Sequence, residues 1–503
     1  MNERKIGILL GYLNIGLQAI IGIIYVPLLL MYIGQSEYGI YQLIGSLIAY
    51  FGIMDFGITA TLTRYYTMYK ANNDKRGMEN ILFLSLIAFI CITIFLLIVG
   101  FIIYANLSNI FSDSMNFTEI VSAKKIFILL LINILFTIST MSFKAIMNAH
   151  ERFFAIKGLE TIQLVLQPIL IIAILHEYPS AFSVALVQTI LNILLSIIRC
   201  IYCFFYLKIK IRYHYFNSNL AIGLCKLSVS TFAVALIDQI FFRTNQIILG
   251  IESGTSAVAI YSIAAVIYFN YMSLSWAISG IFLPHVTSMV AKKVSVNELS
   301  KLFIKIGKWQ YYVLMLCLLG FIILGKEFIV LWAGKEYLSA YFITIVIIVP
   351  FTIDLIQNIG ICILQAYNKY EIRAKVYFFM GVANILLGIP AAKYFGGLGC
   401  AAVTGIIMFL GNGIIMNYYY WKKIHLNIKE FWYKILLLTY KLIIFFIIMF
   451  YINLQFDDFN TSWILFAIKI LLFIIIYLIV LITFCFDNNE KNYIRNMFSK
   501  IKL

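Results

Sequence analysis

The chain has 503 residues, of which 63% are hydrophobic and 12% are charged, and its mean hydropathy is +0.96. A soluble domain has about 45–50% apolar and about 25% charged residues, so this composition excludes a soluble protein and indicates a polytopic membrane protein. The net charge of +16 does not indicate nucleic-acid binding, because membrane proteins retain lysine and arginine in their cytoplasmic loops. The eight cysteines lie mostly in apolar runs, so neither a disulfide framework nor a metal cofactor is expected.

Six apolar segments in the first part of the chain are long enough to cross a bilayer as helices. They cover about residues 6–33, 38–66, 81–104, 126–148, 159–175 and 181–207. In the first segment Asn14, Gln18 and Tyr25 share one helix face, because intervals of four and seven residues return to the same side. The second segment holds Asp55 near its middle. We expect this carboxylate either to line an interior space or to bond a neighbouring helix.

Two cations lie on polar stripes of the fourth and sixth segments. Lys144 is in line with Asn133 and Thr137, and Arg199 is in line with Asn192. Stripes of this kind predict a polar space between helices, into which both cations would point. The alternative is that both side chains extend to the membrane interface, since they lie toward cytoplasmic helix ends.

The seventh segment, at residues 224–250, is apolar enough to span a membrane and yet carries Asp238 and Arg243. A charge in hydrocarbon costs at least about 2.5 kcal/mol, so such residues face a partner or a water-filled cavity. Gln239 and Asn245 extend the same polar stripe. The segment is therefore expected to line an interior cavity. Two plainer alternatives are an ion pair of Arg243 with Asp238 and amides that only join helices.

Seven further segments bring the expected number of spans to fourteen. Three cover about residues 258–290, 311–332 and 341–366, two end near 392 and 421, and two begin near 435 and 463. Asp354 lies on a polar face of the third of these. With this topology 26 of the 38 lysines and arginines fall in loops and ends on one side and five on the other. That asymmetry predicts that both termini are cytoplasmic. The amino end leads directly into apolar sequence without a small-residue cleavage site, so we expect it to be the start of the first span and not a cleaved signal peptide.

An internal repeat relates the two parts of the chain. GQSEYGIY at residues 34–41 matches GTSAVAIY at residues 254–261, and each lies between two long spans. At the same shift Gln18 aligns with Asp238 and Tyr25 with Asn245. The repeat predicts two six-helix lobes related by a parallel pseudo-twofold axis, at residues 1–219 and 220–421, around a central cavity. Residues 422–503 would add two helices and a basic cytoplasmic tail.

The whole chain resembles the polysaccharide or lipid-linked oligosaccharide flippases of the O-antigen translocase type. These belong to a superfamily that also contains multidrug exporters of the MATE kind and peptidoglycan-precursor flippases. The resemblance rests on YGIY at 38–41, YFGIMDFGI at 50–58, FFRTNQIILG at 241–250 with IYS at 260–262, and YFGGLGCAA at 394–402.

The resemblance implies a transporter and not an enzyme. Its substrate would be a polyprenyl-pyrophosphate-linked oligosaccharide, moved across the bacterial inner membrane by alternating access for assembly of O-antigen, lipopolysaccharide or capsule. Family cavities are cationic, a role that maps here to Arg243, Lys144 and Arg199. A polysaccharide polymerase and a chain-length regulator are implied partners besides membrane lipid, and no nucleic acid is expected.

The remaining assignments follow from side-chain chemistry. The amide and phenol groups suit sugar hydroxyls, and they are on Asn14, Gln18, Tyr25, Gln239 and Asn245. The carboxylates would bind a coupling ion or balance charge, and they are on Asp238, Asp55 and Asp354. Coupling to a gradient of H⁺ or Na⁺ or to the membrane potential stays open, because the first span has no acidic residue.

Three other functions compete with this hypothesis. A cation-coupled multidrug exporter of the same superfamily would need acidic residues more than buried cations. A membrane polysaccharide polymerase or ligase would usually display a large outer loop with catalytic residues, and no outer segment here exceeds about twenty residues. A scaffold protein would leave the aligned polar stripes without a role.

Overall fold

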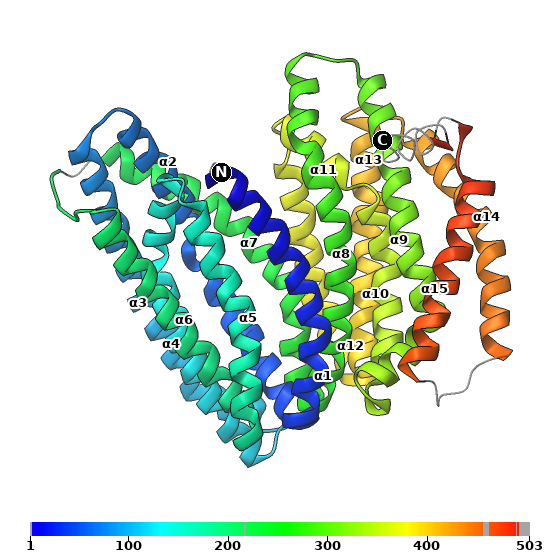
Figure 1. The fold of residues 1–503 in the computed structure, drawn as a ribbon, viewed down its shortest axis with the longest axis horizontal. Helices are drawn as coiled ribbons and strands as arrows, with labels where there is room; N and C mark the ends of the chain where they lie inside the picture. Colours follow the sequence, from blue (N-terminus) through cyan, green and yellow to red (C-terminus); the bar gives the residue numbers. More distant parts are fainter. Residues whose placement is uncertain (1–2, 216–217, 456–461, 489, 492–503) are drawn as a thin grey trace. The chain divides into compact units, whose positions relative to one another are not determined.

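The computed structural model describes residues 3–215, 218–455, 462–488 and 490–491. Within these ranges the chain is built of helices and contains no strand (Figure 1). The predicted all-α polytopic class is confirmed. The basic tail beyond residue 491 lies outside the described residues.

The chain forms two compact units, which we call unit 1 (residues 1–262 and 388–397) and unit 2 (residues 263–387 and 398–503). The helices of unit 1 are α1 (Glu3–Gly52), the 3₁₀ turn η1 (Ile53–Asp55), α2 (Ile58–Ala71), α3 (Lys75–Phe111), α4 (Phe117–Ala149), α5 (Phe153–Glu177), α6 (Ala181–Ile201) with its π-helical end η2 (Tyr202–Tyr206), α7 (Ser218–Glu252) and the first turns of α8 (Gly254–Ala291).

Unit 2 holds the rest of α8 and the later helices. These are α9 (Val296–Trp332), η3 (Lys335–Tyr337), α10 (Ser339–Leu355), α11 (Asn358–Ala366), α12 (Glu371–Met408), η4 (Phe409–Met416), α13 (Asn417–Lys422), α14 (Ile428–Gln455), α15 (Trp463–Val480) and η5 (Leu481–Cys485). A middle stretch of α12, residues 388–397, packs with unit 1.

Eleven segments of the described chain are long and apolar enough to cross a membrane. Two of them, residues 9–71 and 371–422, are 63 and 52 residues long. A single crossing takes about 20 residues, so each of the two contains two crossings. Both bend at a glycine of positive φ, Gly34 at 72° and Gly396 at 57°, where the sequence predicts a turn. Counted in this way, the described residues contain thirteen crossings, and α7, at the place of the expected seventh span, would be the fourteenth.

The two copies of the repeat share a backbone feature. Gly34 and Gly254 begin the matching strings, and their φ angles are 72° and 80°. Glycine adopts this left-handed region without the steric cost that a Cβ would bring. In the structure α7 belongs to unit 1 together with the first six spans, because it packs against α1 and α2. The packing of helices does not show where one sequence repeat ends and the next begins. The lobe boundaries expected at residues 219/220 and 421/422 therefore stay a prediction.

The second expected span is interrupted in the structure. After Gly52 the chain makes one 3₁₀ turn and then passes through Phe56 and Gly57, whose φ angles are 49° and 70°, before α2 begins. Asp55 caps the new helix: its Oδ1 accepts hydrogen bonds from Thr59 N at 3.2 Å and Thr59 Oγ1 at 2.8 Å. The break brings the polar side chain of Asp55 to a helix start.

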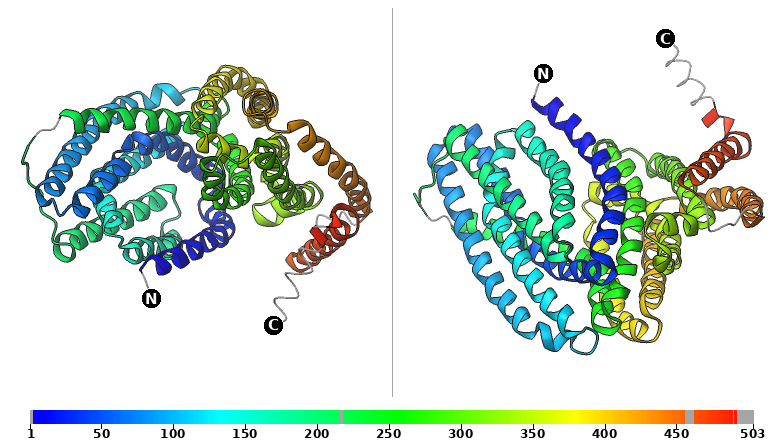
Figure 2. Two further views of the ribbon diagram at one scale, coloured as in Figure 1. Left: turned by 90° about the horizontal axis from the view of Figure 1, so that it is seen from above. Right: turned by 60° about the horizontal axis from the view of Figure 1, so that its bottom comes forward.

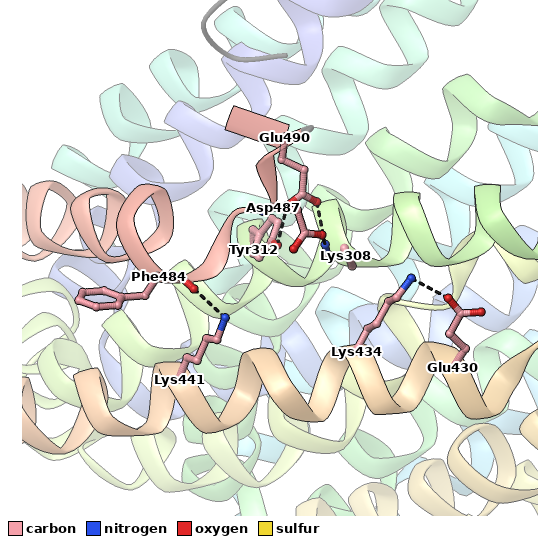
Figure 3. A network of polar contacts seen from close by, with 8 residues as sticks. All are labelled: Lys308, Tyr312, Glu430, Lys434, Lys441, Phe484, Asp487 and Glu490. Atoms are coloured by element: carbon pink, nitrogen blue, oxygen red, sulfur yellow. Dashed lines mark hydrogen bonds and ion pairs between the residues drawn. The ribbon is translucent and has the colours of Figure 1, made fainter. Parts of the chain in front are cut away.

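The last two helices pack on α9 at one edge of unit 2 (Figure 2). At one end Lys308 Nζ lies 2.7 Å from Asp487 Oδ2 and 2.9 Å from Glu490 Oε1 (Figure 3). Deeper in the bundle Lys469 Nζ lies 2.7 Å from Oε1 of Glu327, a side chain that is 1% exposed. These contacts hold α15 and the segment after it to α9 of unit 2.

Candidate functional site

A cavity of about 1100 Å³ lies in unit 1 between α1 and α5. The two helices pack side by side along this part of the unit (Figure 1). The lining residues are Gly7, Gly11, Asn14, Ile15, Gln18, Ile21 and Tyr25 of α1, Glu151 of the preceding loop, and Phe153, Lys157, Glu160, Gln163, Leu164, Gln167 and Pro168 of α5. Each helix contributes residues three and four positions apart, which form one face of an α-helix.

Three predicted sugar ligands line this cavity together. Gln18 is exposed in it, and the Tyr25 hydroxyl is buried with no hydrogen-bond partner among the described residues. Asn14 has a second role, because its amide nitrogen donates to Lys157 O at 3.3 Å and its oxygen accepts from Thr161 Oγ1 at 2.6 Å. Asn14 therefore joins α1 to α5 at the cavity wall.

Two lysines form ion pairs with one carboxylate on the α5 side, and an arginine lies within electrostatic range of it. Glu160 Oε1 lies 3.0 Å from Lys144 Nζ of α4, and Glu160 Oε2 lies 2.8 Å from Lys157 Nζ. Arg199 of α6 interacts electrostatically with the same carboxylate. The structure thus brings Lys144 and Arg199, predicted from separate stripes, to one place. We call Lys144, Lys157, Glu160 and Arg199 the cation cluster.

A second cavity, of about 730 Å³, lies at the break before α2. Its described lining residues are Gly52, Ile53, Asp55, Gly57, Thr59, Ala60, Thr63, Asn148, Phe153, Phe232 and Ala235. Both hydrogen bonds of Asp55 go to Oδ1, so among the described residues Oδ2 has no hydrogen-bond donor. Asp55 thus combines a capping role with one carboxylate oxygen available at the cavity.

The polar stripe of α7 lies elsewhere. Asp238 is exposed, Gln239 and Arg243 are half-buried, and none of the three is among the described residues that line the two cavities. Asn245 is 1% exposed and donates to the Tyr261 hydroxyl at 2.9 Å, and its neighbour Gln246 donates to Ser262 Oγ at 3.0 Å. Asn245 and Gln246 therefore join α7 to α8 within unit 1. A sugar-binding role for Gln239 and Asn245 stays a prediction.

Asp354 lies in unit 2 with an arginine that the stripes did not indicate. The Tyr377 hydroxyl donates to Asp354 Oδ2 at 3.4 Å and accepts from Arg373 Nη2 at 3.1 Å and from Asn412 Nδ2 at 3.0 Å. The Arg373 guanidinium also lies over the Tyr377 ring, 4.7 Å from its centroid. Asp354 is therefore linked to a resident cation through one tyrosine hydroxyl.

Sequence analysis missed the polar face of α5. Lys157, Glu160, Gln163 and Gln167 follow at intervals of three and four, a spacing that would have revealed it. The expected span began near residue 159, whereas the helix begins at Phe153, so Lys157 was assigned to a loop. Hydropathy marks only the part of a helix in hydrocarbon, and the helix continues beyond it.

The architecture is that of a known class of membrane transporter fold. The structure is similar to "Lipid II flippase MurJ, inward closed conformation", with a TM-score of 0.71, 18% identity, and coverage of 94% of this chain and 98% of the other. It is also similar to an inward-facing MATE multidrug resistance transporter of the MOP superfamily, with a TM-score of 0.62, 14% identity, and coverage of 79% and 92%. An outward-facing MATE transporter gives a TM-score of 0.57, 12% identity, and coverage of 86% and 97%.

At these identities the likeness establishes the fold. A comparison with curated protein sequences gives no match. The family model "Polysaccharide biosynthesis protein" matches residues 6–290, which is more than half of the chain. The chain belongs to this polysaccharide biosynthesis family, and the resemblance inferred from its motifs is confirmed.

Proposed function

We propose that the protein is a flippase that carries a polyprenyl-pyrophosphate-linked oligosaccharide across the bacterial inner membrane by alternating access. The product would enter surface polysaccharide assembly, as O-antigen or capsule. Family membership and the MOP fold support a transporter of this substrate class. The observation that carries the proposal is the cavity between α1 and α5, with amides along its walls and cations beside it.

The cavity chemistry matches the two polar parts of such a substrate. Sugar hydroxyls both donate and accept, so amides such as Gln18 and Gln167 and the Tyr25 phenol suit them. A diphosphate requires cationic donors, and the cation cluster provides two lysines and an arginine. In the same proposal Arg243 of α7 is a further phosphate contact.

The proposal extends to orientation and coupling. In this proposal both termini are cytoplasmic, which the charge asymmetry of the loops supports. The amino-terminal Glu3 pairs with Arg152 Nη1 of the loop before α5 at 2.6 Å, so these two segments lie at one end of unit 1. Asp55, with an oxygen at the second cavity, is the residue we assign to a coupling ion, and Asp238 is a further candidate. Asp354 balances the charge of Arg373.

Cation-coupled drug export is the second candidate, and the specific observation in its favour is the Asp55 carboxylate at the second cavity. The two functions differ in the charge of the cargo. An exporter of cationic drugs would be impaired by loss of the Asp55 carboxylate and indifferent to loss of Lys157. A lipid-diphosphate flippase would lose transport when Lys157 is neutralised.

Flipping of a defined lipid-linked oligosaccharide in proteoliposomes tests the proposal. Lys157→Gln and Arg243→Ala are each expected to lower the initial rate at least about tenfold, because each removes a charged donor to the diphosphate. Lys434→Gln is the matched control: Lys434 pairs with Glu430 on the exposed face of α14 at 2.7 Å, and its loss should leave the rate unchanged. Normal rates in both variants, Lys157→Gln at the cavity and Arg243→Ala on α7, would remove the assignment.

A further inference from the structure

One carboxylate of the cavity occupies the position that an anionic ligand would take. The two oxygens of Glu160 bind two different lysines from two helices, Lys144 of α4 at 3.0 Å and Lys157 of α5 at 2.8 Å, and Arg199 of α6 lies in its electrostatic reach. A phosphate group bridges cations in the same manner, with separate oxygens to separate donors. Glu160 is therefore the direct counter-ion of two lysines, with Arg199 as a third positive charge nearby.

The exposure of these side chains allows exchange. Lys144 and Lys157 are 43% and 37% exposed, and Glu160 is 25% exposed. Ion pairs with this degree of exposure are weak, because water solvates both partners when they separate. The pair between Glu327 and Lys469 in unit 2 is the contrast, with its carboxylate 1% exposed. Lys144 and Lys157 can therefore exchange one anion for another.

We propose that Glu160 is a resident anion that the diphosphate of the substrate displaces, so that Lys144, Lys157 and Arg199 form an exchangeable anion site. This inference rests on the function proposed above and adds a specificity-determining residue to it. A diphosphate has more oxygens and more charge than a carboxylate, so it competes successfully for the same donors. Once the substrate leaves, Glu160 pairs with the lysines again.

The exchange has a consequence for turnover. A substrate that binds very tightly in the cavity leaves it slowly, because the binding energy must be given up before release. Glu160 limits that energy, because part of each substrate contact replaces an existing ion pair. Glu151, in the loop before α5, is a second carboxylate at the cavity. Its negative charge repels an anion that does not also contact the cations. The site is thus selective for an anion that can engage several cations at once.

Binding of inorganic pyrophosphate to the purified full-length protein in detergent tests the inference without any transport step. Glu160→Gln removes the competing anion and is expected to lower the dissociation constant about tenfold, whereas Lys157→Gln should raise it about tenfold. Glu430→Gln, which removes the carboxylate of the exposed pair on α14, is the control and should bind as the unmodified protein does. Unchanged or weaker binding by Glu160→Gln would overturn the inference.

A second comparison keeps the test valid if Glu160→Gln alone fails to fold. Lys144→Gln combined with Glu160→Gln removes both members of one ion pair and leaves no charge unpaired between them. The double variant should bind pyrophosphate more tightly than Lys144→Gln alone by about the same tenfold factor. Equal affinity of the double and single variants would show that Glu160 does not compete with the anion.

Flipping kinetics separate this inference from the proposed function. Glu160→Gln should lower both KM and kcat, because tighter binding accompanies slower release. A protein that binds pyrophosphate as predicted but flips no lipid-linked oligosaccharide would refute the function and leave the anion site standing. Flipping by the unmodified protein together with an unaltered KM in Glu160→Gln would refute the exchange alone.

Discussion

The Glu119 carboxylate accepts a hydrogen bond from the Thr255 hydroxyl at 2.8 Å, although 136 positions separate the two residues. The same Oε1 atom accepts from Ser36 Oγ, and Glu119 Oε2 accepts from Asn116 N at 2.9 Å. Ser36 lies in α1 directly after its bend at Gly34, and Thr255 lies at the start of α8 after Gly254; the two segments are the matching strings of the internal repeat. One carboxylate of α4 therefore joins the turn of the first copy to the turn of the second.

The proposed alternating-access mechanism predicts that these two segments separate in one state of the transport cycle. The Ser36 and Thr255 hydroxyl oxygens are 3.3 Å apart, so cysteines at both positions are a pair to test for cross-linking. We expect oxidised Ser36→Cys with Thr255→Cys to lose flipping in proteoliposomes and to recover it on reduction. Each single cysteine variant should flip at the normal rate under both conditions. Full activity of the cross-linked protein would show that the turns stay together.

The same junction predicts a strong effect of one methyl group. A Cβ on Gly39 would lie 2.0 Å from Thr255 O, so Gly39→Ala forces the backbones of α1 and α8 apart within unit 1. We expect a loss of about 2 kcal/mol, measured by thermal unfolding in detergent. Gly45→Ala is the control on the same helix, because its Cβ would meet nothing within 4 Å. That variant should be unchanged or slightly more stable, and equal behaviour of the two would contradict the close approach.

The attachment of α15 to α9 predicts a second stability difference. Lys469→Met leaves the Glu327 carboxylate, 1% exposed, without its 2.7 Å partner. Breaking a buried ion pair on one side costs about 3 kcal/mol, and the thermal transition should fall accordingly. Lys434→Met removes an exposed i,i+4 pair of α14 and should cost less than about 0.5 kcal/mol. Similar losses of stability in the two variants would show that the buried Glu327 pair contributes no more than the exposed one.

Part of the fold and of the site follows from the sequence alone. The intervals between Asn14, Gln18 and Tyr25 predict one helix face, and all three residues line the same cavity. The turns at Gly34 and Gly396 were also predictable, because each lies in a short glycine-containing stretch between two apolar runs. Both features are local, since periodicity and turn chemistry depend on neighbouring residues only.

Other features required the structure. Spacing shows that Asn245 lies on a polar face but not that this face meets Tyr261 in a buried contact. The break at Asp55 was not expected, because the surrounding residues are as apolar as those of an uninterrupted span. The cluster around Glu160 unites α4, α5 and α6, whose packing no local pattern specifies.

The loop between α4 and α5 predicts a pH effect. Burial and the nearby charges of Lys70 and Arg152 lower the pKa of His150 from 6.5 to about 4. Since the unfolded chain binds a proton below pH 6.5 and the folded protein does not, stability is lost as the pH falls from about 6.5 to 4. Allowing for solvent screening of a half-buried group, the loss is about 1 kcal/mol.

His150→Gln isolates this contribution. The His150 ring contacts Tyr66, with Nε2 3.3 Å from the hydroxyl, and glutamine keeps a polar partner there without titrating. Between pH 7.5 and 5 the midpoint of thermal unfolding should fall less in the variant than in the unmodified protein. The difference between the two pH profiles measures His150, because all other groups are shared. Parallel profiles would show that His150 is protonated equally in the folded and unfolded states.

The most direct test of the account is the appearance of a labelled polyprenyl-pyrophosphate oligosaccharide in the outer leaflet of proteoliposomes. The unmodified protein should flip this lipid faster than protein-free vesicles, and inorganic pyrophosphate on the loading side should slow it by competing for the cation cluster. If transport equals that of protein-free vesicles for every lipid-linked oligosaccharide while a cationic drug is exported, the account is contradicted.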